Sequence, residues 1–375
     1  MNTEKRLSEL KSFMEKNDIA LSIVTRPENI YYLSNFLGIS WSRPISFILT
    51  SKSTGLIIPG LEEEHAKAEA NVDKIYVYYE YPEKYEMSFL EYVDRILSKY
   101  PNGTKIGVEF DVMSFGLADY IRNYGYELVD IGKKITEMRF VKDKQEIELM
   151  IEAGRLVSLA LSKSLEHART GLSELEVEQY GNDAVLREIA VKYPDSVLYN
   201  LAMTTSGIVR TVMPNVSTTT RKLEQNDIII HSRQIGFNGY RAECERTFFV
   251  GKPTDEQKEL FRIATEAQRV AMDIIRPGLT AKEVDLAARK VIQKAGYGEY
   301  AVHRLGHGLG LSEHEEPYLR FDNDLVLEEG MAFSLEPGIY VPGIGGFRHS
   351  DTVILTKDGK IVITEHPNDL NDLIF

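Results

Sequence analysis

The sequence contains only one cysteine, Cys244, among its 375 residues. A single cysteine can form neither an intramolecular disulfide nor a zinc site built from several thiolates, and this fits a reducing compartment. The chain also lacks any run of about eighteen consecutive apolar residues, and its first residues contain no apolar segment, so we expect neither membrane insertion nor secretion. These absences together predict a cytoplasmic protein.

Positive charge is also scarce, because 44 Lys and Arg residues stand against 57 Asp and Glu residues, a formal net charge of −13. This balance disfavours polyanionic partners, so nucleic acid is not an expected ligand. The composition is 43% hydrophobic and 27% charged, which is typical of a globular protein. At this length, the chain is expected to fold as two domains or one large domain with a sizeable core.

The first third of the chain alternates short apolar runs with stretches of helical periodicity. We expect strands at about 20–25, 47–50, 55–58, 74–79 and 105–109, and helices at about 5–17, 62–69 and 88–98. Alternation of this kind predicts a three-layer α/β domain. We assign it residues 1–134.

The rest of the chain, 135–375, carries longer amphipathic stretches followed by strand-like runs. Helices are expected at about 146–168, 172–193, 255–276 and 280–295, and strands at 227–235, 239–250, 331–341 and 351–356. Two helix pairs, each followed by strands, suggest a pseudo-repeat. This predicts an α+β domain.

Histidines and glutamates gather in the strand-rich part of this second domain, which makes it a candidate site. They are His231, His303, His307, His314, His349, Glu243, Glu245, Glu315, Glu316 and Glu336. Glycines flank His307 and are expected to let the backbone pass close to a ligand. Alternation along a strand puts Glu243 and Glu245 on one face, where one carboxylate should have a raised pKa unless a cation lies between them. A solvated strand face and a structural histidine are the alternatives.

Several sequence blocks resemble the pita-bread-fold hydrolases, a family that includes Xaa-Pro dipeptidase, aminopeptidase P, methionine aminopeptidase and creatinase. The blocks are Gly306-His-Gly-Leu-Gly, His314-Glu-Glu-Pro, Gly330-Met-Ala-Phe-Ser-Leu-Glu-Pro-Gly-Ile-Tyr and Gly345-Gly-Phe-Arg-His-Ser-Asp. The similarity covers the whole chain. It implies a creatinase/prolidase-like α/β N-terminal domain and an α+β pita-bread catalytic domain.

Metallopeptidases of this family hold two divalent metals with two aspartates, a histidine and two glutamates. Registering the blocks puts Ser232, Glu243, His307, Glu336 and Ser350 at those positions. Neutral hydroxyls are poor ligands for such cations. The resemblance therefore predicts no intact dinuclear centre and at most one divalent metal (Mn, Co or Zn), on Glu243, His307 and Glu336. His231 and His349, each next to one of these serines, could replace the missing metal ligands only if a β-bulge changed the strand register at both places.

Creatinase is the branch of the family that works without metal, and three features resemble it. Glu245 matches a glutamate that holds the substrate guanidinium. Arg43 registers on an arginine that reaches the neighbouring subunit's site and binds the substrate carboxylate, which implies a homodimer; the alternative is a surface arginine. His349 replaces a second guanidinium-binding glutamate, which argues against creatine itself.

The resemblance assigns two sets of residues. Predicted catalytic residues are His314, His349, Glu243, Glu245 and Glu336, with His314 or His349 as general base. Predicted substrate-binding residues are Arg43, His303, His307 and Arg348. A further catalytic histidine of the family falls near Pro214-Asn215 here.

The leading hypothesis is a hydrolase that cleaves a C–N bond in a small carboxylate-bearing substrate without an intact dinuclear metal centre. The second is a metal-dependent Xaa-Pro dipeptidase acting on dipeptides. The third is a non-catalytic, peptide-binding member of the fold.

Overall fold

The computed structural model describes residues 3–375. The chain divides into two compact units, Met1–Arg139 and Phe140–Phe375. The boundary predicted after residue 134 falls inside a helix of the first unit, α6 (Gly132–Met138), which the charged, poorly periodic sequence did not indicate. No helix within residues 3–375 has both the length and the hydrophobicity needed to span a lipid bilayer.

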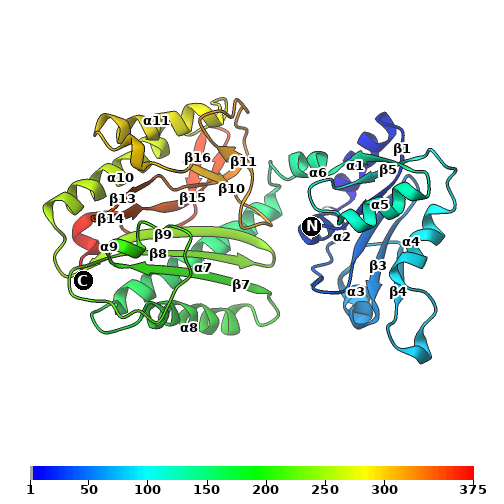
Figure 1. Ribbon diagram of the computed structural model, residues 1–375, viewed down its shortest axis with the longest axis horizontal. Helices are drawn as coiled ribbons and strands as arrows, with labels where there is room; N and C mark the ends of the chain where they lie inside the picture. The colour runs from blue at the N-terminus through cyan, green and yellow to red at the C-terminus, as the bar shows by residue number, and fades with distance from the viewer. Residues whose placement is uncertain (1–2) are drawn as a thin grey trace. The chain divides into compact units, whose positions relative to one another are not determined.

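The first unit is a six-stranded mixed sheet in the order β4-β3-β2-β1-β5-β6, with helices on both faces (Figure 1). Leu21 and Ile23 of β1 pack in one cluster with Phe89 and Ile121 from the helices α4 and α5. The expected α/β architecture is confirmed. The elements are α1 (Thr3–Lys16), β1 (Ile19–Val24), α2 (Pro27–Ser34), β2 (Ser46–Thr50), β3 (Thr54–Pro59), α3 (Glu63–Glu69), β4 (Lys74–Tyr78), α4 (Phe89–Leu97), β5 (Lys105–Val108), α5 (Phe115–Asn123) and β6 (Glu127–Asp130).

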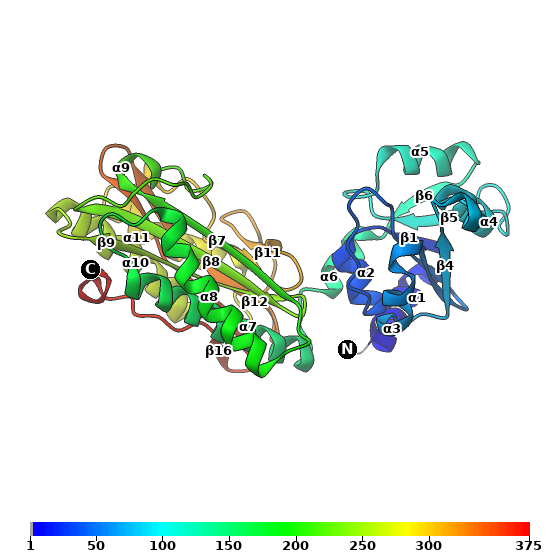
Figure 2. The same ribbon diagram turned by 90° about the horizontal axis from the view of Figure 1, so that it is seen from below.

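The second unit is built on an eight-stranded sheet in the order β11-β10-β12-β15-β9-β8-β7, with β16 beside β15. The helix α7 packs against β8 and β9, and α8 packs beside α7 and against β7 (Figure 2). The elements are α7 (Lys144–His167), α8 (Glu174–Lys192), β7 (Leu198–Ser206), α9 (Gly207–Arg210), β8 (Asp227–Phe237), β9 (Tyr240–Val250), α10 (Asp255–Ile274), α11 (Ala281–Lys294), β10 (Gly306–Gly308), β11 (Glu315–Leu319), β12 (Ala332–Leu335), β13 (Gly338–Val341), β14 (Gly345–Arg348), β15 (Ser350–Thr356) and β16 (Gly359–Val362).

The four long helices of this unit lie within a few residues of their predicted ranges, because each starts at a strong sequence signal. Each of them begins with a capping box. The side chain of the N-cap residue accepts a hydrogen bond from the backbone N–H of the third helical residue, and the side chain of that third residue accepts one from the backbone N–H of the N-cap residue. The pairs are Asp143 with Glu146, Ser173 with Glu176, Thr254 with Gln257, and Thr280 with Glu283.

A tight hairpin fixes the register of the two longest strands. Asn238 and Gly239 have φ values of 48° and 90°, and Phe237 pairs directly with Tyr240. Two positive φ angles are the requirement of a two-residue turn that matches the twist of a hairpin. The register then continues without a bulge and places Gln234 opposite Glu243.

The run 331–341, expected as one strand, is two strands in different sheets, β12 and β13. The break falls at Glu336-Pro337, because proline has no N–H to donate to a strand ladder. Glu336 donates its own N–H to Leu305 O at 2.8 Å, which fixes the backbone where the chain leaves the sheet. The carboxylate therefore projects from the end of β12.

Candidate active site

His307 lies at the centre of the candidate site, on β10. A Cβ atom at Gly306 would lie 2.0 Å from Ser334 O, and one at Gly308 would lie 2.7 Å from Glu316 O. These glycines therefore allow close approach of the neighbouring strands, and not of a ligand as the sequence suggested. His307 Nδ1 lies 3.0 Å from Gly308 O, which accepts its proton, so the ring presents Nε2 to the site.

Two buried glutamates face this nitrogen. His307 Nε2 lies 3.1 Å from Glu336 Oε1 and 3.7 Å from Glu243 Oε2. Glu243 also accepts hydrogen bonds from Ser350 Oγ at 2.7 Å and from Gln234 Nε2 at 3.4 Å. An imidazole and two carboxylates thus share one desolvated space.

Burial and mutual charge separate the proton affinities of these groups. Burial raises the pKa of Glu243 to about 7, and the negative charge of Glu336 adds to the effect. Burial also opposes ionisation of Glu336, but the hydrogen bond and charge of His307 outweigh it and lower the pKa of Glu336. Burial opposes a charged His307, yet Glu336 and Glu243 together raise its pKa. The two carboxylates therefore favour the protonated form of His307, while Glu243 titrates near neutral pH.

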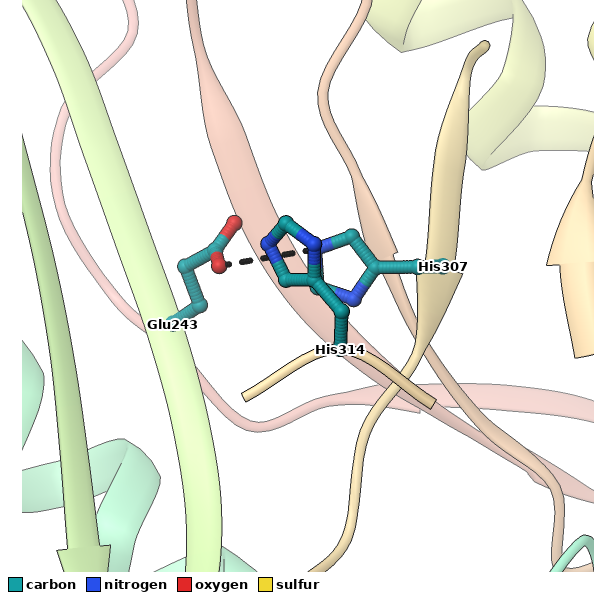
Figure 3. Close-up of side chains that lie close together, drawn as sticks. All are labelled: Glu243, His307 and His314. Carbon is teal, nitrogen blue, oxygen red and sulfur yellow. Dashed lines mark ion pairs between the residues drawn. The ribbon is translucent and has the colours of Figure 1, made fainter. Parts of the chain in front are cut away.

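A second imidazole stands against the first. The rings of His307 and His314 have centroids 3.9 Å apart, and both point toward Glu243 (Figure 3). Burial, followed by the positive charge of His307, lowers the pKa of His314 to about 4. His314 is therefore neutral at physiological pH and able to accept a proton.

Glu245 and Arg348 form a closed ion pair at one side of the site. Arg348 Nη2 lies 2.7 Å from Glu245 Oε2, and Arg348 Nε donates to Glu245 Oε1. Their side chains are 1% and 9% exposed. The sequence assigned Glu245 to a cationic substrate nitrogen and Arg348 to the substrate. In the structure the two charges pair with each other, and their roles toward a substrate stay predictions.

His349 and His231 lie on the opposite face of the sheet. The His349 ring is 4.7 Å from that of Phe261, and its Nδ1 lies 3.2 Å from Asn368 Oδ1. His231 accepts a hydrogen bond from Arg233 Nε at 2.9 Å. Strand alternation without a bulge separates both histidines from the carboxylates, so neither replaces a metal ligand, and His349 is not placed to act as the general base.

A cavity of about 690 Å³ opens beside these groups. It brings together the predicted residues His303, His314, Glu336 and Arg348, and also Asn215, at the place of the family's further histidine. Arg43 belongs to the first unit, where Arg43 Nε lies 2.6 Å from Glu80 Oε2. That Arg43 binds the substrate carboxylate in the site of a neighbouring subunit stays a prediction. Gln234, Arg304 and Tyr340 were not predicted. Arg304 lies three residues before His307 and Tyr340 ends the block that begins at Gly330, so both had a signal, whereas Gln234 had none.

The residues present fit one metal ion better than two. Ligand atoms of Glu243, His307 and His314 lie within 4.8 Å of one another, and two imidazoles with a carboxylate suit Zn²⁺ and similar cations. At the position of a further carboxylate, Ser350 instead donates its proton to Glu243. A neutral hydroxyl that donates to Glu243 does not supply the negative charge that a second cation needs.

Comparison with known proteins identifies the family of the chain. Residues 148–357 match the model of metallopeptidase family M24, and residues 6–141 match the creatinase/prolidase N-terminal domain. The chain belongs to metallopeptidase family M24. It is 30% identical to the Xaa-Pro dipeptidase of Pyrococcus furiosus, over 98% of this chain and 99% of that protein.

Solved structures of M24 proteins extend the likeness to the fold. The prolidase of Pyrococcus horikoshii superposes with a TM-score of 0.85 at 30% identity, covering 98% of this chain and 99% of that one. The Xaa-Pro dipeptidase of Bacillus anthracis gives 0.87 at 29% identity over 100% of both chains. The expected pita-bread fold is confirmed, and the M24 member described here is a hydrolase acting on C–N bonds.

Proposed function

We propose that this M24 protein hydrolyses a C–N bond in a small carboxylate-bearing substrate without the two-metal centre of the family's peptidases. The observation that carries the proposal is the hydrogen bond from Ser350 Oγ to Glu243 Oε1. A serine at this position brings a proton where a metal site needs negative charge. Ser232 likewise stands in place of a metal-binding carboxylate of the family.

Proton transfer is available from the protein's own residues. His314 is neutral, borders the cavity, and can remove a proton from an attacking water. Glu243, with its pKa raised to about 7, can return a proton to the departing nitrogen. Two titratable groups whose pKa values are pushed apart are the usual arrangement for such an acid and base.

Charge stabilisation can come from His307 next to them. Glu336 and Glu243 raise the pKa of His307 and so favour its protonated form, which would place a positive charge near the negative oxygen of a tetrahedral intermediate. A fixed charge in a desolvated site stabilises such an intermediate far more than water does.

A second candidate function is a single-metal Xaa-Pro dipeptidase, favoured by the ligand cluster of Glu243, His307 and His314. A divalent ion bound there would act as a Lewis acid toward the scissile carbonyl and lower the pKa of a bound water. In this case His314 serves as a ligand, and the cavity residues alone orient the dipeptide.

A substrate panel with chelation separates these candidates. Dipeptides ending in proline, N-acyl amino acids, amidines and lactam-derived acids are incubated with protein before and after exhaustive treatment with a strong chelator, and amine release is measured. We expect hydrolysis that survives chelation and is lost in His314→Gln. Loss on chelation with recovery in Mn²⁺, Co²⁺ or Zn²⁺ supports the dipeptidase instead. No hydrolysis of any compound, with binding retained, supports a peptide-binding role.

A further inference from the structure

Arginine dominates the charged lining of the cavity. Arg289, Arg304, Arg320 and Arg348 all contribute to its wall, together with a single carboxylate from Glu336. Such a wall repels cationic ligands and favours anionic ones, provided that some of this charge is left unpaired by the protein.

Three of these arginines are already neutralised. Arg348 pairs with Glu245, as described above. Arg289 donates to both oxygens of Asp285 at 3.0 and 3.2 Å. Arg320 donates to both oxygens of Asp322 at 2.6 Å. Each guanidinium fork is engaged by a carboxylate of this chain.

Arg304 differs from the other three. No carboxylate within residues 3–375 lies within ion-pair distance of it. Its guanidinium carbon stacks 4.2 Å above the centre of the Tyr318 ring, and its Nη2 lies 3.5 Å from His314 Nδ1. The aromatic ring holds the planar fork in place while leaving its N–H edge available.

We propose that Arg304 binds the carboxylate of the substrate and so sets the specificity of the cleft for small anionic compounds. This inference rests on the proposed function and deepens it. A planar guanidinium can take a carboxylate through two parallel hydrogen bonds, which fixes orientation as well as charge. The clamp belongs to the same chain as the catalytic groups, so it needs no second subunit.

The position of Arg304 also relates the substrate carboxylate to the scissile bond. His314 contacts the guanidinium on one side and the His307 ring on the other, so one imidazole separates the anion site from the reacting groups. Val302 and Phe321, 66% and 53% exposed, add apolar surface to the same cavity. A carboxylate a few bonds from the scissile C–N bond, with an apolar side chain, fits this lining; an N-acyl amino acid has this chemistry.

The test compares N-acetyl-L-leucine with N-acetyl-L-leucinamide, which differ only in the carboxylate. Binding at neutral pH is measured by ligand-observed NMR, and the same spectra report any release of acetate. Wild-type protein should bind the acid at least tenfold more tightly than the amide. Arg304→Gln should remove this preference, and Arg304→Lys should keep part of it.

Arg320→Gln is the matched control, because it removes one positive charge from the same cavity but from an arginine that is already paired. It should keep the preference for the acid. An Arg304→Gln protein that still prefers the acid, an equal loss in Arg320→Gln, or a wild-type protein without preference overturns the inference. Because binding and acetate release are read as separate signals, failure of the proposed hydrolysis is a separate result from failure of this anion site.

Discussion

Breaking the buried Glu245–Arg348 pair should destabilise the second unit strongly. The substitution Glu245→Gln keeps the size of the side chain but removes its charge. Arg348 would then be left buried, with the Glu336 carboxylate 3.9 Å away as its nearest remaining ion-pair partner. Removing one partner of a buried ion pair costs about 3–5 kcal/mol, because the other charge stays desolvated. A unit of this size loses about 2–4 °C in Tm for each kcal/mol, so we expect a fall of about 6–20 °C.

Calorimetry or circular dichroism on the full chain measures this shift. Glu266→Gln is the control, because it breaks a pair of similar geometry, 2.7 Å to Arg269, whose side chains are 45% and 59% exposed. That variant should show no resolvable change in Tm. The double variant Glu245→Gln/Arg348→Met should recover much of the loss, since no unpaired charge remains. Equal Tm values for the two single glutamate variants would refute the reasoning.

Three further predictions concern single histidines and Arg43. His314→Gln should keep the fold and lower kcat by about 10²–10⁴-fold, measured on whichever panel compound is hydrolysed; an unchanged kcat would exclude His314 as the base. Burial lowers the pKa of His349 well below 6.5, so below pH 6.5 the unfolded chain binds a proton there that the folded chain does not, and stability falls. His349→Gln should reduce this slope by about 1.4 kcal/mol per pH unit in urea unfolding at pH 5–6, and an unchanged slope would show that another group is responsible. If Arg43 serves a neighbouring subunit, Arg43→Ala should raise KM without changing Tm, and mixing it with inactive Glu336→Gln should restore activity; no restoration under proven subunit exchange would count against sharing.

The fold was largely predictable because its local signals agree with its packing. The four long helices carry capping boxes, and the turn at Asn238-Gly239 specifies the β8–β9 hairpin. The strands β6, β7, β10, β11, β14 and β16 were not predicted; all but β7, which has nine residues, are three to five residues long and give little periodicity. The Glu336-Pro337 break shows how one proline can divide an apolar run that reads as a single strand.

The site was predictable in its members but less so in their pairing. Alternation along β9 gave the common face of Glu243 and Glu245, and the sequence motif gave His307 and His314. That Arg348 lies against Glu245 depends on the meeting of β14 with β9, residues far apart in the chain, which no local pattern encodes. The same long-range register sends His349 to the opposite face from Ser350.

The central claim is that Ser232 and Ser350 have removed the second metal site, and metal stoichiometry tests it most directly. Wild-type protein and the triple variant Ser232→Asp/Glu243→Asp/Ser350→Glu, which restores the family's carboxylates, are equilibrated with Mn²⁺, Co²⁺ or Zn²⁺, passed through gel filtration and analysed by inductively coupled plasma mass spectrometry. We expect no more than one ion per wild-type chain and a second ion in the variant. Two ions per wild-type chain would contradict the account.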